Sequence, residues 1–191
     1  ISVEGEVQTP YGATESLPIA SMSGSEIVTE TWPQSRLGKG TCVGRSLPGI
    51  EIRIIRLSDQ PITNWFATEE LPAGEIGEIV VRGGVVTSSY YNNANETRLA
   101  KIKDGETFWH RLGDLGYLDE KGRLWFGGRR AHRVETTAGP MYSIPCEAIF
   151  NEHPDVYRSA LVGIGGMLAL APHDSINLAA ALHYRMELGK N

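Results

Sequence analysis

The sequence predicts a mixed α/β fold, in which a β-rich region is followed, from about residue 129, by a smaller α+β module. Two segments, EIRIIRL at 51–57 and GEIVVR at 77–82, are rich in β-branched residues and nearly alternate between apolar and polar side chains. Proline and glycine mark tight turns between the strand-like runs. After residue 129 the sequence pattern changes to that of a helix, a strand and a second helix.

The β-rich region contains two pairs of predicted strands. We expect the segments 51–57 and 77–82 each to bury one face, with a turn between them at Pro72-Ala73-Gly74. Two shorter strands, at 117–119 and 123–126, flank the sequence DEKG, where Gly122 supplies the positive φ of a tight turn. The connections are short, so neighbours in sequence are expected to pair.

The α+β module opens with a predicted helix at 145–153. Pro145 suits a helix start, Glu147 follows in the first turn, and Ile149 and Phe150 lie on the apolar side. The sequence HPDV ends this helix, and YRSALVGI at 157–164 is typical of a strand. A second amphipathic helix is predicted at 175–188.

Composition limits the class of protein. The 191 residues are 41% hydrophobic and 21% charged, as in soluble globular proteins, and no apolar run is long enough to span a bilayer. A net charge of -5 argues against nucleic acid or an anionic membrane as the main partner. Cys42 and Cys146 lie far apart, without metal-binding or redox spacing. We therefore expect a cytoplasmic protein without a disulfide framework or zinc.

The sequence YGATES, from Tyr11 to Ser16, is the first candidate site. Gly12 follows an apparent strand end and permits a tight turn, and Tyr11 offers an aromatic face to a flat ring. The Thr14 hydroxyl and the Glu15 carboxylate are adjacent, which suits a phosphate group together with a divalent metal. The alternative, a polar loop or helix cap, is common and stays open.

The sequence RLGDLG is the second candidate site. The Asp114 carboxylate, expected just before a strand, is an acceptor that suits the two hydroxyls of a ribose, or else it caps backbone N–H groups in a turn. Arg129 follows a glycine pair and can reach the same sugar or a phosphate, although a lone surface arginine is the alternative. His110 is near this turn and is a further candidate for the site, although it can instead have a structural role in packing.

Other motifs give little support to other chemistries. VGIGGM at 162–167 lacks the third glycine of a dinucleotide-binding loop. The five histidines show no metal-ligand spacing, and no serine has the context of a hydrolase nucleophile. Basic residues do not alternate with aromatic ones as they do in nucleic-acid grooves.

Taken in order, four blocks of the chain resemble the adenylate-forming superfamily, which includes acyl-CoA synthetases, luciferases and nonribosomal adenylation domains. The blocks, between Gln8 and about Gly163, are YGATE, GEIGEIVVRGGVVTSSYYNNANET, WHRLGDLGYLDEKGRLWFGGRR and IPCEAIFNEHPDVYRSALVG. The resemblance implies that residues 1–128 are the β-rich C-terminal portion of the large, nucleotide-binding domain. Residues 129–191 would then begin a small, mobile α+β C-terminal domain.

The same resemblance implies roles for the candidate residues toward ATP and Mg²⁺. Asp114 would bind the ribose hydroxyls with Arg129 beside it, and Tyr11 would lie against adenine. Gly12 and Ala13 would form part of the same nucleotide-binding segment.

The adjacent pair Thr14 and Glu15 would be catalytic. Thr14 would contact the α-phosphate and Glu15 would hold Mg²⁺. Little covalent help from side chains is needed when a carboxylate attacks the α-phosphorus of ATP, so positioning and charge neutralisation supply the catalysis.

Within the superfamily, the segment from Phe108 to Gly163 is most similar to the β-lactone synthetases of bacterial long-chain olefin biosynthesis. The resemblance implies that a long-chain β-hydroxy acid is adenylated and that its own hydroxyl then displaces AMP, and it also implies association with other enzymes of that pathway. The alternative is a long-chain fatty acyl-CoA synthetase or fatty acyl-AMP ligase, and a non-catalytic nucleotide-binding relative is the rival from another class. Ala131 stands at the hinge position usually held by Asp or Lys, which fits an enzyme without a CoA half-reaction.

Two elements of the superfamily are not found in the sequence. The phosphate loop is expected before residue 1 and the late catalytic lysine well after Gly163, and Lys190 is not assigned to that role. The chain also begins in a strand-like run without an initiator Met. We therefore expect a piece of a longer polypeptide.

Overall fold

The computed structural model describes residues 5–162 and 166–170. The helix predicted at 175–188 and Lys190 lie outside the described residues, as does the middle of the glycine-containing motif at 162–167. None of the helices in the described part has the length and apolar character needed to span a bilayer.

The described residues form twelve strands, four short α-helices and four further helical turns. The strands are β1 (Gln8–Ala13), β2 (Ser16–Ser23), β3 (Thr41–Ser46), β4 (Ile50–Ile55), β5 (Gly77–Gly83), β6 (Lys101–Asp104), β7 (Thr107–Leu118), β8 (Leu124–Arg129), β9 (Val134–Thr136), β10 (Gly139–Met141), β11 (Arg158–Val162) and β12 (Gly166–Leu170). The helical elements are α1 (Gly24–Glu26), η1 (Ile27–Thr31), α2 (Trp32–Gln34), η2 (Ser35–Lys39), η3 (Trp65–Ala67), α3 (Ala94–Ala100), η4 (Arg130–His132) and α4 (Ser143–Asn151).

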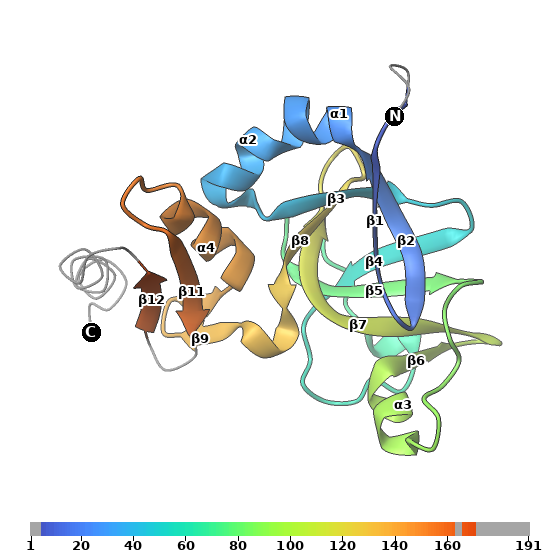
Figure 1. Cartoon of the computed structure of the whole chain (residues 1–191). Coiled ribbons are helices and arrows are strands. Elements are labelled where there is room, and N and C mark those ends of the chain that lie inside the picture. Colours follow the sequence, from blue (N-terminus) through green and yellow to red (C-terminus); the bar gives the residue numbers. More distant parts are fainter. Residues whose placement is uncertain (1–4, 163–165, 171–191) are drawn as a thin grey trace.

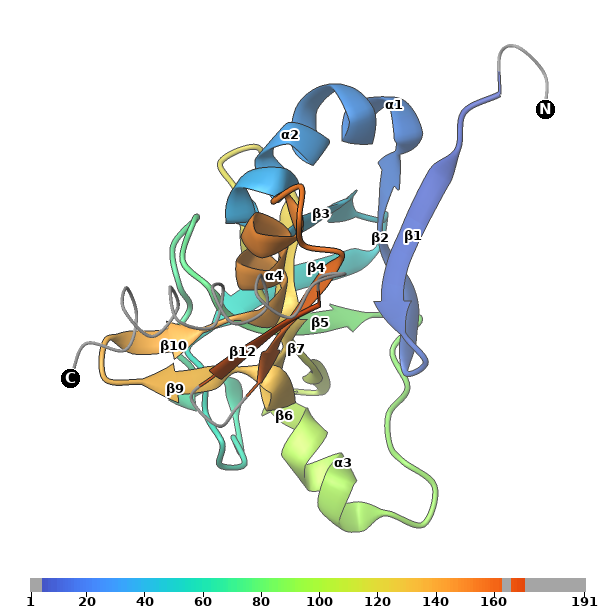
Figure 2. The same cartoon turned by 60° about the vertical axis from the view of Figure 1, so that its left-hand side comes forward.

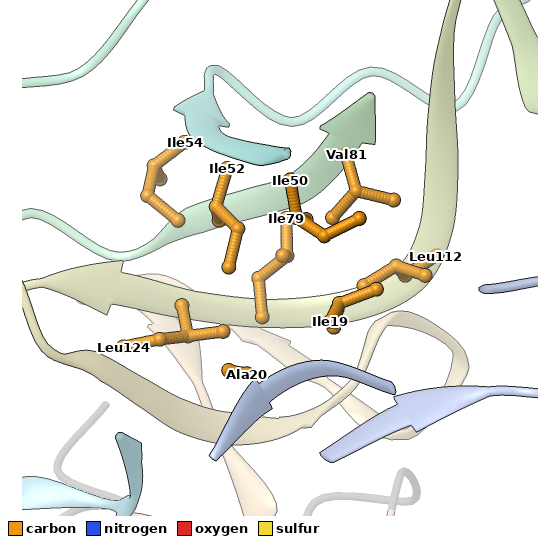
Figure 3. Close-up of a cluster of buried hydrophobic side chains, with 9 residues drawn as sticks. All are labelled: Ile19, Ala20, Ile50, Ile52, Ile54, Ile79, Val81, Leu112 and Leu124. Atoms are coloured by element: carbon orange, nitrogen blue, oxygen red, sulfur yellow. The ribbon is translucent and has the colours of Figure 1, made fainter. Parts of the chain in front are cut away.

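One sheet of eight antiparallel strands forms the larger part of the structure, at the right of Figure 1. Its strand order is β1-β2-β3-β8-β7-β5-β4, with β6 added to β7. The sheet curls, because Ile19 of β2 packs in the same buried cluster as Ile52 of β4, although these strands lie near opposite ends of that order. Figure 3 shows this cluster, to which β5, β7 and β8 also contribute. The curl is what brings β1 close to β7.

The predicted pairing of 51–57 with 77–82 is confirmed by β4 and β5, in which Ile52 lies opposite Val81. The expectation that each strand buries one face is wrong for β5, because Ile79 belongs to one buried cluster and Val80 to another on the opposite side. The second cluster includes Trp109, whose ring stacks on Trp65 at 4.5 Å between ring centroids. The loop that carries Trp65 thus covers the second face of β5, which the sequence pattern predicted to be exposed.

Strand β7 is longer than predicted. It runs for 12 residues, so the short strand expected at 117–119 is its last part, and Asp114 lies inside the strand and not before it. β7 pairs in turn with β6, β5 and β8, and these ladders carry it through the glycines at 113 and 116. The hairpin to β8 turns as expected, with Gly122 at a φ of 70°.

Two helical segments were not predicted. A helical run from Gly24 to Lys39 combines α and π turns and has a kink at Gly38, where φ is 81°. Pro33 interrupts its hydrogen bonding because proline has no N–H to donate. Helix α3 stands at the bottom of Figures 1 and 2, beside β6.

The described residues that follow Arg129 in the sequence form two separate two-stranded sheets, β9–β10 and β11–β12, with α4 beside them (Figure 2). The helix predicted at 145–153 is present as α4, which begins two residues earlier, at Ser143. The strand predicted at 157–164 is present as β11. Close packing joins α4 to β8, since a Cβ on Gly128, whose φ is 129°, would lie 2.4 Å from the Ser143 hydroxyl.

Candidate active site

The hairpin of β1 and β2 carries the first group of candidate residues. Tyr11, Gly12 and Ala13 lie in β1 and not in a turn, and Thr14 and Glu15 form the turn itself. The prediction that Gly12 provides a tight turn is therefore wrong. A Cβ at this position would lie 2.4 Å from the Ser16 carbonyl oxygen, so Gly12 is needed for the close approach of the two strands.

Tyr11, Asp114 and Arg129 meet in one cluster. The Tyr11 hydroxyl donates to Asp114 Oδ2 at 2.5 Å, and Arg129 Nη1 lies 2.9 Å from Asp114 Oδ1. Asp114 and Arg129 lie opposite each other in the β7–β8 ladder, which explains their contact. The Asp114 side chain is only 5% exposed, whereas that of Arg129 is 55% exposed. A buried acceptor is thus bordered by a phenol and by a cation that reaches solvent.

The electrostatics of this cluster favour hydrogen bonding by Asp114. Burial raises the pKa of Asp114, and the Tyr11 hydroxyl and the Arg129 guanidinium act in the opposite direction. Burial and the nearby carboxylate raise the pKa of Tyr11, so its hydroxyl keeps its proton and remains a donor. Although Arg129 is close, Asp114 Oδ1 accepts no well-directed hydrogen bond from the described residues. This buried oxygen has the capacity to accept one from a ligand.

Glu15 lies in a second cluster. Its Oε1 accepts a hydrogen bond from the Tyr90 hydroxyl at 2.8 Å, and its carbonyl accepts one from the Thr87 N–H, also at 2.8 Å. Burial acts to raise the pKa of Glu15, but the Tyr90 hydroxyl, a backbone N–H, His110 and Lys101 together lower it. The carboxylate is therefore ionised at neutral pH and half covered.

Thr14 is the candidate with the least structural definition. It lies in the turn between the two clusters, and its side chain is exposed. Tyr11 on one side of it reaches Asp114, and Glu15 on the other side reaches Tyr90. The hairpin thus brings the YGATE segment against β7 and against the loop before α3.

Sequence reasoning missed Tyr90 and a buried ion pair that supports β7. Arg111 donates two hydrogen bonds to Glu78 Oε2, at 2.6 and 3.1 Å, and the two side chains are 3% and 0% exposed. Arg111 also donates to the carbonyls of Ser58, Gln60 and Leu99. Arg111 belongs to the motif RLGDLG, but its acidic partner, Glu78, lies 33 residues earlier, in β5. Such a pairing depends on the sheet register, which the sequence pattern alone does not define.

His110 is buried, and its Nδ1 lies 3.3 Å from the Ala100 carbonyl oxygen. Burial and the nearby Lys101 lower the pKa of His110 to about 4, so the ring is neutral at physiological pH. This supports the packing role that was the alternative for this residue. Among the described residues there is no group of three or more His, Cys, Asp or Glu side chains that could hold a metal ion.

Comparisons with known proteins identify relatives of this chain, although no protein-family model matches it. It is 46% identical over 170 residues to an olefin β-lactone synthetase of Xanthomonas campestris pv. campestris, and 44% identical over 177 residues to one of Stenotrophomonas maltophilia. These alignments cover 86% and 90% of the chain. The chain spans 30% and 32% of the length of these two relatives. An indoleacetate–CoA ligase of Aromatoleum aromaticum is 31% identical over 153 residues, which are 80% of the chain and 26% of that protein.

Solved structures share the fold. The amide bond synthetase McbA of Marinactinospora thermotolerans matches with a TM-score of 0.70 and 28% identity, over 96% of this chain and 36% of McbA. O-succinylbenzoate coenzyme A synthetase of Bacillus subtilis, in complex with ATP and a magnesium ion, matches with a TM-score of 0.61 and 28% identity, over 81% of this chain and 28% of that one. The mixed α/β fold class predicted from the sequence is confirmed.

Proposed function

This chain is related to the adenylate-forming enzymes, and from that relationship we propose that the protein activates a carboxylate with ATP and converts a long-chain β-hydroxy acid to a β-lactone. The observation that carries the proposal is the Asp114 carboxylate, buried between Tyr11 and Arg129 with Oδ1 still able to accept a hydrogen bond. A ribose presents two neighbouring hydroxyl donors, which a carboxylate in this state accepts well.

We propose that Tyr11, Gly12, Ala13, Thr14, Asp114 and Arg129 bind the nucleotide. The Tyr11 hydroxyl orients Asp114 toward the ribose, while its ring lies against adenine. The exposed Arg129 guanidinium is free to turn toward the sugar or a phosphate as a charged donor. The backbone at Gly12 and Ala13 gives the nucleotide access to the strand.

Glu15 and Thr14 are proposed as the catalytic pair. Since the described residues offer no larger metal cluster, Glu15 would hold Mg²⁺ as a single carboxylate, with water and phosphate oxygens as the other ligands. That arrangement is usual for Mg²⁺, and the lowered pKa of Glu15 keeps its charge available. The metal would neutralise phosphate charge, and the Thr14 hydroxyl would donate to the α-phosphate.

The proposed reaction has two displacements. In the first, a substrate carboxylate oxygen attacks the α-phosphorus of ATP, and the bond to pyrophosphate breaks. In the second, the β-hydroxyl oxygen attacks the acyl carbon, the bond to AMP breaks, and the hydroxyl proton is lost. The hydroxyl and the acyl carbon belong to one molecule, so the second nucleophile is already present at high effective concentration and CoA is not required.

A long-chain fatty acyl-CoA synthetase or fatty acyl-AMP ligase is the alternative function. The CoA ligase relative supports it less, with 31% identity against 44% and 46% for the two β-lactone synthetases. We also propose that residues 1–128 belong to the large domain and 129–191 to a small mobile domain. Location in the cytoplasm and association with other olefin-pathway enzymes stay predictions.

The test is pyrophosphate exchange and product analysis with the full-length protein. A long-chain 3-hydroxy acid and the matching unsubstituted acid are each supplied with ATP and Mg²⁺, with and without CoA. We expect lactone from the hydroxy acid without CoA, and loss of exchange in Asp114→Ala and Glu15→Gln variants. CoA thioester from both acids would instead establish the ligase alternative. Exchange that is unchanged in both variants would contradict the proposed site.

A further inference from the structure

A hollow lies away from Asp114, between the 61–64 loop and the 89–103 segment that carries α3. We call it the α3 pocket; its volume is about 1140 Å³, and Ile62, Asn64, Tyr90, Asn93 and Lys101 are among the residues that line it. This volume is large enough for a metabolite. The lining residues include hydroxyl and amide side chains, but no Asp or Glu is found among those described.

Three cations, Arg98, Lys101 and Lys103, line the α3 pocket. None of the three forms an ion pair with a carboxylate of the described residues, since Arg98 donates to the Asn95 side-chain oxygen and Lys101 to the Thr87 carbonyl. Arginines elsewhere in the sheet do have acidic partners, among them Arg82 and Arg123. Glu15 acts electrostatically on Lys101, whereas Arg98 and Lys103 form no ion pair with a carboxylate of the described residues. Cations gathered in this way around a hollow repel one another, which an anionic ligand relieves.

We propose that the α3 pocket binds a small phosphorylated ligand that carries at least two phosphate groups. Several cations together with neutral amide and hydroxyl donors match the many oxygen acceptors of such a ligand better than they match one carboxylate. The space also exceeds what a single phosphate fills. This inference does not depend on the proposed lactone synthesis.

The α3 pocket is separate from the proposed nucleotide site but adjoins it. Tyr90 lines the pocket, and its hydroxyl is bound to Glu15 on the proposed magnesium side. Tyr90 thus stands between the two sites. A probe supplied without metal does not depend on the proposed Glu15 magnesium site, and the location of its effects distinguishes the α3 pocket from the nucleotide site.

The experiment uses inorganic pyrophosphate as the probe and the full-length protein in the presence of EDTA. Calorimetry compares the wild type with Arg98→Met and Lys103→Met, both exposed residues whose replacement leaves the core intact. Each change removes one charged donor, so we expect affinity about tenfold weaker in each variant. Lys39→Met is the matched control, because Lys39 is also exposed but lies in η2, which follows α2 in the upper part of Figure 1, whereas α3 lies at the bottom.

Location and pH dependence give two further readouts. Pyrophosphate should shift the amide resonances of residues 62–64 and 92–98. Burial lowers the pKa of Lys101 to about 8, with Glu15 acting in the opposite direction. Between pH 7 and 9.5 Lys101 loses its proton while Glu15 stays ionised and His110 stays neutral. The ratio of wild-type to Lys101→Met affinity should therefore fall toward one over this range, a comparison that cancels the titration of pyrophosphate itself.

Three results would overturn the inference. Equal weakening in Lys39→Met and Lys103→Met would mean diffuse attraction to surface charge. Affinity unchanged in both pocket variants would mean that these cations do not hold the ligand. Resonance shifts confined to residues 11–15 and 114 would place the probe in the nucleotide site instead.

Discussion

At the scale of single residues, Asp114 and Asp119 show how two aspartates on one hairpin serve different ends. Asp114 is buried, and its pKa is raised by burial. Asp119 accepts hydrogen bonds from the Lys121 and Arg123 N–H groups at 2.9 Å. Burial acts to raise its pKa, but the Trp125 side chain and the N–H and guanidinium of Arg123 together lower it. The ionised form of Asp114 therefore opposes folding, whereas that of Asp119 stabilises the turn.

The first prediction compares Asp114→Asn with Asp119→Asn. Asp114→Asn removes a buried charge and keeps an oxygen that accepts from Tyr11, so we expect unchanged or higher thermal stability at pH 7. Loss of one charged acceptor should weaken ATP binding by about 10- to 100-fold. Asp119→Asn should do the opposite, with lower stability and normal nucleotide affinity. Thermal unfolding and calorimetry measure the two effects. Normal ATP binding by Asp114→Asn would remove the ribose role.

The second prediction concerns His110, whose pKa is lowered to about 4 by burial and by Lys101. An unfolded histidine titrates near 6.5, so the unfolded state takes up a proton first as the pH falls. Stability from the neutral ring is therefore complete above about pH 6.5 and is lost progressively down to about pH 4, by at most about 3 kcal/mol. The free energy of unfolding, measured with urea across this pH range, should fall less steeply with decreasing pH in His110→Asn than in the wild type. The control is His132→Asn, on the exposed turn η4, and an identical slope in all three proteins would contradict the assigned origin.

At the scale of elements, the strands were more predictable than the helices. The β4–β5 pair follows from alternating β-branched residues, a local pattern. The helical run from Gly24 has an equally local signal, since Ser23 caps it by accepting from the Glu26 N–H at 3.2 Å. No helix was predicted there, and Val28, Thr29 and Pro33, which follow the cap, have low helix propensity. The cap of α3, in which Asn93 accepts from the Glu96 N–H, was overlooked in the same way.

The contacts between elements far apart in sequence could not be predicted from spacing. The resemblance carried Asp114 and Arg129 to one ligand, and the β7–β8 ladder places them opposite each other. The approach of Tyr90 to Glu15 depends on how the loop before α3 folds back, and no pattern in the sequence encodes that distance. The residue types of the candidate site could therefore be predicted from local sequence. Their contact partners could not, because these depend on how the sheet curls.

The third prediction tests the cap of the Gly24–Lys39 helical run. Ser23→Ala removes the acceptor for the Glu26 N–H and should lower the free energy of unfolding by about 1 kcal/mol. Ser35→Ala is the matched control. Ser35 lies inside the run, so replacement by the better helix former should leave stability unchanged or slightly raise it. Denaturant unfolding compares the two variants. Equal effects of both substitutions would mean that the cap contributes nothing specific.

At the scale of the whole molecule, ion pairs join the residues that follow Arg129 to the part that contains the large sheet. Arg36 Nη2 of η2 lies 2.5 Å from Glu152 Oε2 behind α4, and Arg133 Nη2 lies 2.6 Å from Asp59 Oδ2. These pairs are largely exposed on at least one side, and exposed pairs typically contribute less than about 1 kcal/mol each. Ion pairs of this strength do not fix an orientation by themselves, and α4 also packs closely against β8 and η2.

The last prediction is that charge reversal at Glu152 changes how the two parts are oriented. Glu152→Lys replaces an attraction to Arg36 by repulsion, and a change of about 1 kcal/mol shifts the ratio of two orientations roughly fivefold. Spin labels at Val28 and Tyr157, both exposed, would report a broader or longer distance distribution by pulsed electron resonance. The swapped pair Arg36→Glu with Glu152→Arg should restore the original distribution. Glu26→Lys is the control, because its partners, Arg45 in β3 and Arg123 just before β8, both precede the part after Arg129, and the orientation should not change. If Glu152→Lys and the wild type give the same distribution, packing of α4 against η2 and β8 determines the orientation, and the ion pairs do not.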